Sequence, residues 1–446
     1  MEETCTAKFV SHLQKQFEGK KVLILGMGRE GKSTLQWLQK VQNCEIWLSD
    51  QKQEVLHQYE AEGIQVLPDN SAYEQFQVII KSAGVAVRSP KLQKYLQSGG
   101  KITSQLQLFL EVFRSQTLGV TGTKGKSTTS TLIHHVIKMA DKPTVLAGNI
   151  GQAVFEIVTQ LEAETIAVIE MSSYQLETVT ISPHWAVWLN FFPEHLNYHQ
   201  SLENYFAAKE NITKYQKVED VFFYSCDFPE LEKIQTKAKK ETFSHEQMAA
   251  FLAELPKDVY QHLSPVIVQQ NLLPAWFVSQ ELQISKEVFF RAIRTFQPLP
   301  HRLQNIGTFD GVTFIDDTLA TIPEAAVAAL HAVPNVSVIL LGGFDRGISY
   351  DLIVKTVIEK NIPAVALFKP SGEKMLELFR HYEPASTRKV QLVNSMEEAI
   401  RFAVEQAHPG TTVLLSPASP SFGQFQDYEA KSAEFVHWIK TITAHQ

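Results

Sequence analysis

The residues best suited to chemistry lie in a glycine-rich loop at residues 121–129, with the sequence TGTKGKSTT. A strand-like run at residues 118–120 precedes the loop, and a helical pattern follows it. In such loops backbone N–H groups surround phosphate oxygens, a lysine such as Lys126 reaches the β- and γ-phosphates, and a hydroxyl such as that of Ser127 binds Mg²⁺. The spacing departs from the strict G-x-x-x-x-G-K-S pattern, which needs glycine where Val120 stands. The loop predicts an ATP site.

A second glycine-rich turn, GMGREG at residues 26–31, follows a strand-like run and precedes a helical one. Asp50 ends the next predicted strand, about 20 residues further on, as in dinucleotide-binding turns. Such glycines let the backbone approach a diphosphate at a helix N-terminus. Alone, the turn fits a nicotinamide cofactor, another nucleotide or nucleotide sugar, or a structural turn. The phosphate loop favours a ligase over a dehydrogenase, because a dehydrogenase has no need of ATP.

Three further side chains are chemically suggestive but open to ordinary interpretations. Glu170 ends a strand-like run, where a carboxylate suits a hard cation at the carboxyl edge of a parallel sheet or serves as a solvated cap. His195 lies in a loop and Lys209 in a helical stretch, where most such residues have no catalytic role. The residues alone leave these alternatives open.

The elements that must position these residues alternate between strand and helix along the whole chain. Runs of β-branched and aliphatic residues, such as KVLIL, IAVIE and VSVILLG, are separated by helical patterns, which predicts parallel sheets covered on both faces. We predict an α/β chain with three domains. They are a Rossmann-like N-terminal domain at residues 1–105, a central P-loop ATPase-type parallel sheet at 106–297 and a Rossmann-like C-terminal domain at 298–446.

Composition narrows the function classes. The chain has 446 residues, three cysteines and a formal net charge of −7, so it presents no basic field for nucleic acid. The cysteines lack the spacing of a metal site or disulfide framework, and no secretion signal is evident. No apolar run approaches the roughly 20 residues that cross a bilayer. We expect a cytoplasmic monomer with no nucleic-acid or membrane partner.

The order of motifs resembles the Mur ligase family, and in particular its glutamate-adding members, across all three predicted domains. The residues that carry the resemblance are TGTKGKSTT from Thr121, GNIG from Gly148, EMSSYQLE from Glu170, LNFFPEHLNYH from Leu189, YFAAKE from Tyr205, PLPHRLQ from Pro298, DDTLAT from Asp316, LGGFDRG from Leu341 and LSPASPSFGQF from Leu415. The resemblance implies an amide-bond ligase that uses ATP to add glutamate to UDP-N-acetylmuramoyl-L-alanine through an acyl phosphate. It also implies a part in peptidoglycan synthesis, and so in cell wall biogenesis, cell shape and cell division.

The same resemblance implies a set of site residues. The catalytic and metal-binding set is Lys126, Ser127, Glu170, His195 and Lys209, with two Mg²⁺ ions and a carbamate on Lys209. The ATP set is Gly122, Thr123, Lys124, Gly125, Lys126, Ser127, Thr128, Asn271, His301, Arg302 and Asp317. The nucleotide-sugar set is Gly28, Arg29, Asp50, Ser82, Gly84, Asn149, Ser172 and Gln175. The glutamate set is Thr321, Arg346, Ser421, Phe422 and Tyr428.

The chain departs from the family pattern at three positions. Glu194 replaces the usual aspartate before His195, and Asn197 stands where aspartate is frequent. Leu319 replaces a lysine close to nucleotide and amino acid, as in a related subgroup that uses L-glutamate. We expect D-glutamate as the substrate, with the L-glutamate-adding variant as the alternative.

Three other function classes are weighed against this expectation. A folate polyglutamate ligase would lack the turn at residues 26–31, and a dehydrogenase would use that turn for a dinucleotide. A non-catalytic ATP-binding switch is disfavoured because Ser127, Glu170, His195 and Lys209 are all present.

Overall fold

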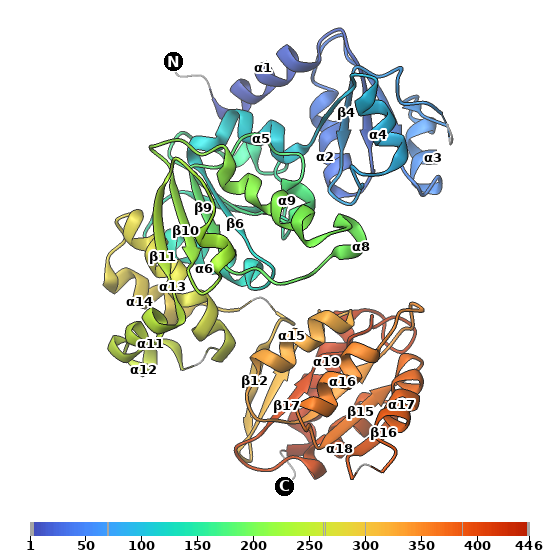
Figure 1. The fold of residues 1–446 in the computed structure, drawn as a ribbon, viewed down its shortest axis with the longest axis vertical. Coiled ribbons are helices and arrows are strands. Elements are labelled where there is room, and N and C mark those ends of the chain that lie inside the picture. Colours follow the sequence, from blue (N-terminus) through green and yellow to red (C-terminus); the bar gives the residue numbers. More distant parts are fainter. Residues whose placement is uncertain are drawn as a thin grey trace. The chain divides into compact units, whose positions relative to one another are not determined.

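The computed structural model describes residues 4–68, 71–261, 263, 265–298, 300–385 and 387–443. The side chains at positions 196, 197, 265 and 266 fall outside this description. Three separate sheets of five, six and six strands lie along the chain (Figure 1). By compactness the chain divides into one unit of Met1–Pro256 with Gln270–Phe296 and a second of Lys257–Gln269 with Gln297–Gln446.

The first sheet has strand order β3-β2-β1-β4-β5 and is parallel throughout. The sequence KVLIL forms its central strand because every residue after the first is buried, as in a strand covered on both faces. The elements are α1 (Cys5–Phe17), β1 (Lys21–Leu25), α2 (Arg29–Leu38), β2 (Glu45–Ser49), α3 (Glu54–Ala61), β3 (Gln65–Val66), β4 (Val78–Lys81), α4 (Pro90–Gln97) and β5 (Lys101–Thr103).

The central sheet has strand order β11-β10-β9-β6-β8-β7 and is also parallel. Its elements are α5 (Gln105–Phe113), η1 (Arg114–Gln116), β6 (Thr117–Thr121), α6 (Lys126–Met139), β7 (Thr144–Gly148), η2 (Val158–Gln160), β8 (Ile166–Glu170), α7 (Ser173–Leu176), β9 (Trp185–Trp188), α8 (Leu196–His199), α9 (Leu202–Lys214), β10 (Val221–Ser225), α10 (Pro229–Glu232) and β11 (Lys239–Phe243). Four helices follow: α11 (His245–Glu254), α12 (Lys257–Tyr260), α13 (Pro265–Glu281) and α14 (Lys286–Thr295).

Aromatic packing joins the first two sheets into one core. The Phe9 ring lies 5.1 Å from Trp37 and 4.9 Å from Phe155, measured between ring centroids. The Trp37 indole N–H also donates to the Phe155 carbonyl over 2.8 Å. Fully burying one such side chain stabilises the fold by about 1.5–3 kcal/mol. These contacts explain why both sheets belong to one compact unit.

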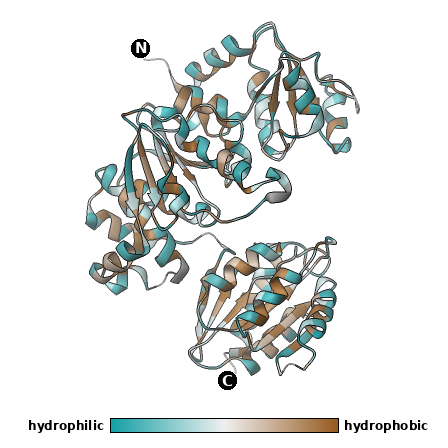
Figure 2. Ribbon diagram, viewed as in Figure 1, coloured by the Kyte–Doolittle hydropathy of each residue, from teal (hydrophilic) through white to brown (hydrophobic). Residues whose placement is uncertain are grey.

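The third sheet has strand order β12-β13-β17-β14-β15-β16, with only the β12–β13 pair antiparallel among the described pairs. Its elements are β12 (Gln304–Phe309), β13 (Val312–Asp316), α15 (Pro323–Ala332), β14 (Val336–Gly342), α16 (Asp351–Glu359), β15 (Ala364–Phe368), α17 (Ser371–Tyr382), β16 (Lys389–Val393), α18 (Met396–Gln406), β17 (Thr412–Leu415) and α19 (Tyr428–Thr443). In each unit hydrophobic strands lie between helices whose outward sides are hydrophilic (Figure 2).

The α/β class and the parallel sheets predicted from the sequence are confirmed. One sheet falls inside each of the predicted ranges 1–105, 106–297 and 298–446. Those boundaries stay predictions, since the first two sheets are packed into a single compact unit. Within the described part of the chain, no helix has both the length and the apolar character needed to cross a membrane.

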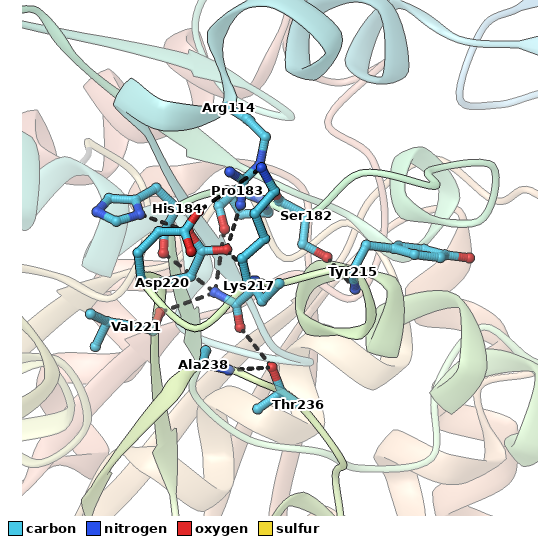
Figure 3. Close-up of polar contacts among 12 residues, drawn as sticks. Arg114, Ser182, Pro183, His184, Tyr215, Lys217, Asp220, Val221, Thr236 and Ala238 are labelled. Atoms are coloured by element: carbon cyan, nitrogen blue, oxygen red, sulfur yellow. Dashed lines mark hydrogen bonds and ion pairs between the residues drawn. The ribbon is translucent and has the colours of Figure 1, made fainter.

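A buried polar network ties the amino ends of two central strands together. The Asp220 side chain is fully buried, and its carboxylate accepts hydrogen bonds from the Arg114 guanidinium and from the Lys217 N–H (2.6 Å). His184 Nδ1 lies 2.7 Å from the other carboxylate oxygen. Figure 3 shows these side chains converging on Asp220. His184 precedes β9 and Asp220 precedes β10, so the network lies at the amino ends of these parallel strands. The phosphate loop follows β6 and lies at the carboxyl ends.

Candidate active site

The phosphate loop follows β6 and opens directly into α6, as the sequence predicts. Gly125 forms the N-cap of α6 with φ 80°, a left-handed conformation that favours glycine. A Cβ at this position would also lie 3.0 Å from the amide nitrogen of Asn271. The loop therefore presents backbone N–H groups at a helix N-terminus, which is an anion-binding arrangement.

The predicted ATP residues of unit 1 gather at this loop. Lys126 is the first residue of α6, and its ammonium donates to the Thr123 carbonyl over 2.8 Å. Ser127 is buried in the first turn of the helix. Asn271, on α13, donates to the Gly125 carbonyl at 3.3 Å and to Thr129 Oγ1 at 2.8 Å. Asn271 thus holds the closing end of the loop.

Asn190, which follows β9, holds the same loop, and it is not among the site residues predicted from the sequence. Its side-chain oxygen accepts from the N–H groups of Thr123 (2.9 Å) and Lys124 (2.8 Å), and its amide donates to the Lys124 carbonyl at 3.0 Å. Tyr205 adds a hydroxyl contact of 3.1 Å to Thr123 Oγ1. The only sequence signal is that both residues lie inside motifs of the resemblance.

Lys209 reaches the loop from α9 and is buried, with 1% of its surface exposed. Its amine donates to the Gly122 carbonyl at 2.7 Å and lies 4.9 Å from the centre of the Tyr205 ring. Burial drives the pKa of Lys209 well below its usual value, and the positive charge of Lys126 acts in the same direction. Burial therefore shifts this amine toward its neutral, nucleophilic form relative to a solvated surface lysine.

Glu170 ends β8 and is also buried, with 1% exposed. One carboxylate oxygen accepts a hydrogen bond from the Asn149 amide at 2.8 Å. The other oxygen is buried and has no hydrogen-bond partner. An unpartnered buried carboxylate oxygen is costly unless a cation or donor binds there.

His195 occupies a strained backbone position just before α8. Its φ of 58° is left-handed, which is uncommon outside glycine and frequent in functional loops. Burial lowers the pKa of His195, and the charges of Lys126 and Lys209 act in the same sense against Glu194. The neutral imidazole this favours is the form that binds metals. Glu194, one of the departures from the family pattern, pairs with Lys124 of the phosphate loop.

These side chains suit Mg²⁺ in chemistry. The phosphate loop, the unpartnered Glu170 oxygen and a carbamate on Lys209 would offer the oxygen ligands that Mg²⁺ prefers. No cluster of three or more His, Cys, Asp or Glu residues that could hold a metal occurs among the described residues. The side chain of Asn197 lies outside the described residues.

Close packing requires glycine at two of the three glycine positions in the turn at residues 26–31, Gly26 and Gly31. A Cβ on Gly31 would lie 2.0 Å from the Gly26 carbonyl oxygen, whereas one on Gly28 would meet nothing within 4 Å. Asp50 accepts from the Met27 N–H at 2.6 Å, so its carboxylate supports the turn itself. Ser82 donates to the Gly26 carbonyl over 2.7 Å. The backbone at Gly28 therefore has open space beside it, and its role in binding a diphosphate stays a prediction.

Two contacts link the remaining predicted nucleotide-sugar residues of this turn and the central sheet. Arg29 donates to the Gly151 carbonyl, beside Asn149. Ser172 and Gln175 form a capping box at α7, and Gln175 donates to Glu30 at 2.9 Å. A Cβ added at Gly84 would meet nothing within 4 Å. The contacts that Ser172 and Gln175 make with each other and with Glu30 are structural bonds that the sequence did not indicate.

In the second unit the paired aspartates Asp316, the last residue of β13, and Asp317 form a network of hydrogen bonds. Asp316 is fully buried and binds Thr318, His301 Nδ1 (3.0 Å) and Ser432. Asp317 accepts from Ser416 at 2.8 Å, and burial raises its pKa to about 7. Arg302 is exposed.

Two features of the predicted glutamate set point to a ligand. Ser421 is buried, and its hydroxyl has no hydrogen-bond partner. Arg346 and Phe422 are exposed, as is expected of groups that meet a small molecule. Thr321 and Tyr428 are partly exposed, and Tyr428 begins α19.

Lys431 is a buried group in this unit that the sequence did not single out. Its amine donates to the Gly342 carbonyl at 2.9 Å, and burial lowers its pKa to about 7. The glycine pair of LGGFDRG is thereby joined to α19.

Comparison with known proteins places this arrangement. Residues 120–267 match the family described as the Mur ligase middle domain, and residues 301–419 match the Mur ligase, glutamate ligase domain. The chain is 31% identical over 454 residues to the UDP-N-acetylmuramoylalanine–D-glutamate ligase of Desulfitobacterium hafniense strain Y51, with 94% of this chain and 97% of that protein covered. It is 30% identical over 444 residues to the protein of the same name from Geobacillus sp. strain WCH70, with 94% and 97% covered.

A solved structure agrees at the level of the fold. The crystal structure of a MurF ligase from Thermotoga maritima in complex with ADP aligns with a TM-score of 0.54 at 15% identity, covering 97% of each chain.

Proposed function

We propose that this chain, which belongs to the Mur ligase family, is an ATP-dependent ligase that joins D-glutamate to UDP-N-acetylmuramoyl-L-alanine during peptidoglycan precursor synthesis. The observation that carries the proposal is the phosphate loop held by Asn190 and Asn271, beside the buried side chains of Glu170 and Lys209. The names of the near full-length relatives support the substrates.

The reaction follows from the chemistry of a carboxylate. A free carboxylate is a poor acyl donor, so its oxygen first attacks the γ-phosphorus of ATP, and ADP leaves with the electrons of the broken P–O bond. The glutamate amine then attacks the acyl phosphate carbon through a tetrahedral intermediate, and phosphate leaves. The amine gives up its protons as the amide forms. No covalent enzyme nucleophile is needed.

The chain's own residues position and neutralise these groups. The N–H groups of residues 125–128 and the Lys126 ammonium would hold the ATP phosphates, which is positioning and electrostatic catalysis, while the N–H groups of Thr123 and Lys124 donate to Asn190. Mg²⁺, when bound by Ser127, Glu170, His195 and modified Lys209, would supply further positive charge to the transferring phosphoryl group. In the C-terminal domain, Arg346 and Ser421 suit the carboxylates of glutamate.

We propose that Lys209 carries a carbamate, formed when its neutral amine adds to carbon dioxide and releases a proton. Its burial against the Gly122 carbonyl supports this, because an anionic carbamate in that place would be an oxygen ligand. Lys209→Ala should lose activity and recover part of it with added short carboxylic acids. Lys214→Ala, an exposed position on the same helix, is the matched control and should behave as wild type. Wild-type turnover in Lys209→Ala would refute the carbamate.

Isotope transfer tests the acyl phosphate. UDP-N-acetylmuramoyl-alanine labelled with ¹⁸O in its carboxylate should deliver one labelled oxygen to the released phosphate in the presence of ATP and glutamate. Lys126→Ala should release no glutamate-dependent phosphate. Unlabelled phosphate from the wild-type enzyme would refute the mechanism.

The L-glutamate variant of the same reaction remains the second candidate. Leu319 is the specific observation behind it, since it places an apolar side chain where the family pattern has a lysine. The Leu319 N–H donates to the His301 carbonyl at 3.1 Å, which fixes its backbone beside the predicted ATP residues.

A further inference from the structure

A junction between the first and central domains centres on Tyr198. Its hydroxyl lies 3.0 Å from the Val85 carbonyl and 3.0 Å from Glu177 Oε2. The other carboxylate oxygen of Glu177, whose side chain is 6% exposed, pairs with the Arg88 guanidinium. Val85 and Arg88 belong to the loop of residues 82–88, which also contains Ser82 and Gly84 of the predicted nucleotide-sugar set. We call these contacts the Tyr198 junction.

The same tyrosine is joined to the loop that carries His195. Its backbone N–H donates to the His195 carbonyl at 3.0 Å, and its ring packs edge-on against Tyr174 with centroids 4.3 Å apart. The Tyr174 ring in turn lies 5.1 Å from the His195 imidazole. His195 is held in a left-handed conformation, so its position depends on such neighbours.

We propose that Tyr198 is a positioning residue that couples the nucleotide-sugar loop to the His195 loop, so that nucleotide-sugar binding and Mg²⁺ binding favour each other. The inference rests on the proposed function, because that function assigns a ligand to each loop. Its physical basis is one tyrosine whose hydroxyl is held by the first loop and whose ring and backbone are packed into the second. A ligand that orders residues 82–88 fixes the position of the Val85 carbonyl, to which the Tyr198 hydroxyl donates. The Tyr198 ring is then held in place against Tyr174.

Coupling of this kind is reciprocal. If the nucleotide sugar strengthens Mg²⁺ binding by some factor, Mg²⁺ must strengthen nucleotide-sugar binding by the same factor. Loss of the hydroxyl removes the link to Val85 and Glu177 but leaves the ring packing and the His195 backbone contact. The coupling factor should therefore fall while the fold is kept.

The test measures the affinity for UDP-N-acetylmuramoyl-alanine by calorimetry, for wild type and Tyr198→Phe. A non-hydrolysable ATP analogue is present throughout, and Mg²⁺ is either present or absent. In wild type Mg²⁺ should strengthen binding by about fivefold or more, within the usual range for coupled sites. In Tyr198→Phe that factor should fall toward one. Glu177→Gln should reduce it from the other side of the junction, and the double variant should lose no more than the larger single loss.

Tyr215→Phe is the matched control, because the described hydrogen bond of Tyr215 uses its backbone N–H, not its hydroxyl. It should keep the wild-type factor. A wild-type coupling factor in both Tyr198→Phe and Glu177→Gln would overturn the inference while leaving the proposed function intact. A wild-type protein that binds no nucleotide sugar would instead overturn the proposed function, and this inference with it.

Discussion

Asn190 fixes the phosphate loop through contacts that its place in the sequence does not reveal. One side chain satisfies two loop N–H groups and one carbonyl, and an aspartate in the same position could serve only the two N–H groups. The residue-scale consequence is that loop geometry, and with it ATP binding, depends on a residue outside the loop itself.

We expect Asn190→Ala to lower kcat/KM for ATP by about ten- to hundredfold, because small misplacements of positioning groups have effects of that size. Asn190→Asp should also be impaired, since it loses the donor to Lys124 and adds negative charge near the phosphates. Steady-state kinetics with varied ATP would measure both. Unchanged kinetics in Asn190→Ala would show that the loop holds its shape without this clamp.

The raised pKa of Asp317 predicts that the stability of the fold depends on pH. Its pKa is raised to about 7 by burial, so between its unfolded value of 3.8 and about 7 the folded chain holds a proton that the unfolded chain has released. The folded state then binds more protons, and the Asp317 contribution to stability is lost as pH rises through this window. Asp317→Asn should be relatively more stable toward the upper end of the window.

Denaturant unfolding at several pH values would measure this as a difference between wild type and Asp317→Asn that grows by at most about 1.4 kcal/mol per pH unit. Asp310→Asn, an exposed position on the same domain, should show no such trend. A pH-independent difference for Asp317→Asn would mean that the carboxylate is ionised in the fold throughout.

Among the elements, the Asp220 network lies at the amino ends of β9 and β10, whereas the phosphate loop follows the carboxyl end of β6. Asp220→Ala should destabilise the chain by about 3–5 kcal/mol, as expected when one partner of a buried ion pair is removed. Glu219→Ala is the control, because that side chain is 61% exposed and surface changes stay within about 0.5 kcal/mol. Thermal and denaturant unfolding would measure both. Equal stability of the two variants would contradict a structural role for the network.

The strands that frame the site could be predicted because they are largely buried and rich in aliphatic and β-branched residues, as in β6, β8 and β14. The contacts that hold the site could not. The contacts of Asn190, Glu30 and Lys431 are with residues that lie far away along the chain. A single sequence does not show which distant residues meet in the fold. Asp50 is another example. The sequence predicts that it binds a ligand, whereas its carboxylate accepts a hydrogen bond from the Met27 N–H and so supports the turn itself.

The described part of the whole molecule contains three sheets, which follow one another along the chain. The two Mur ligase family matches fall on the central and C-terminal sheets. Near full-length similarity to named D-glutamate ligases extends the likeness to the first sheet.

Phosphate release from ATP with UDP-N-acetylmuramoyl-L-alanine, measured in parallel with D-glutamate and L-glutamate, tests the proposed ligase activity. We expect phosphate release that depends on the nucleotide sugar and is stimulated by D-glutamate. Stimulation by L-glutamate alone would reassign the enantiomer to the variant that Leu319 suggests. Phosphate release that neither glutamate stimulates would contradict the account.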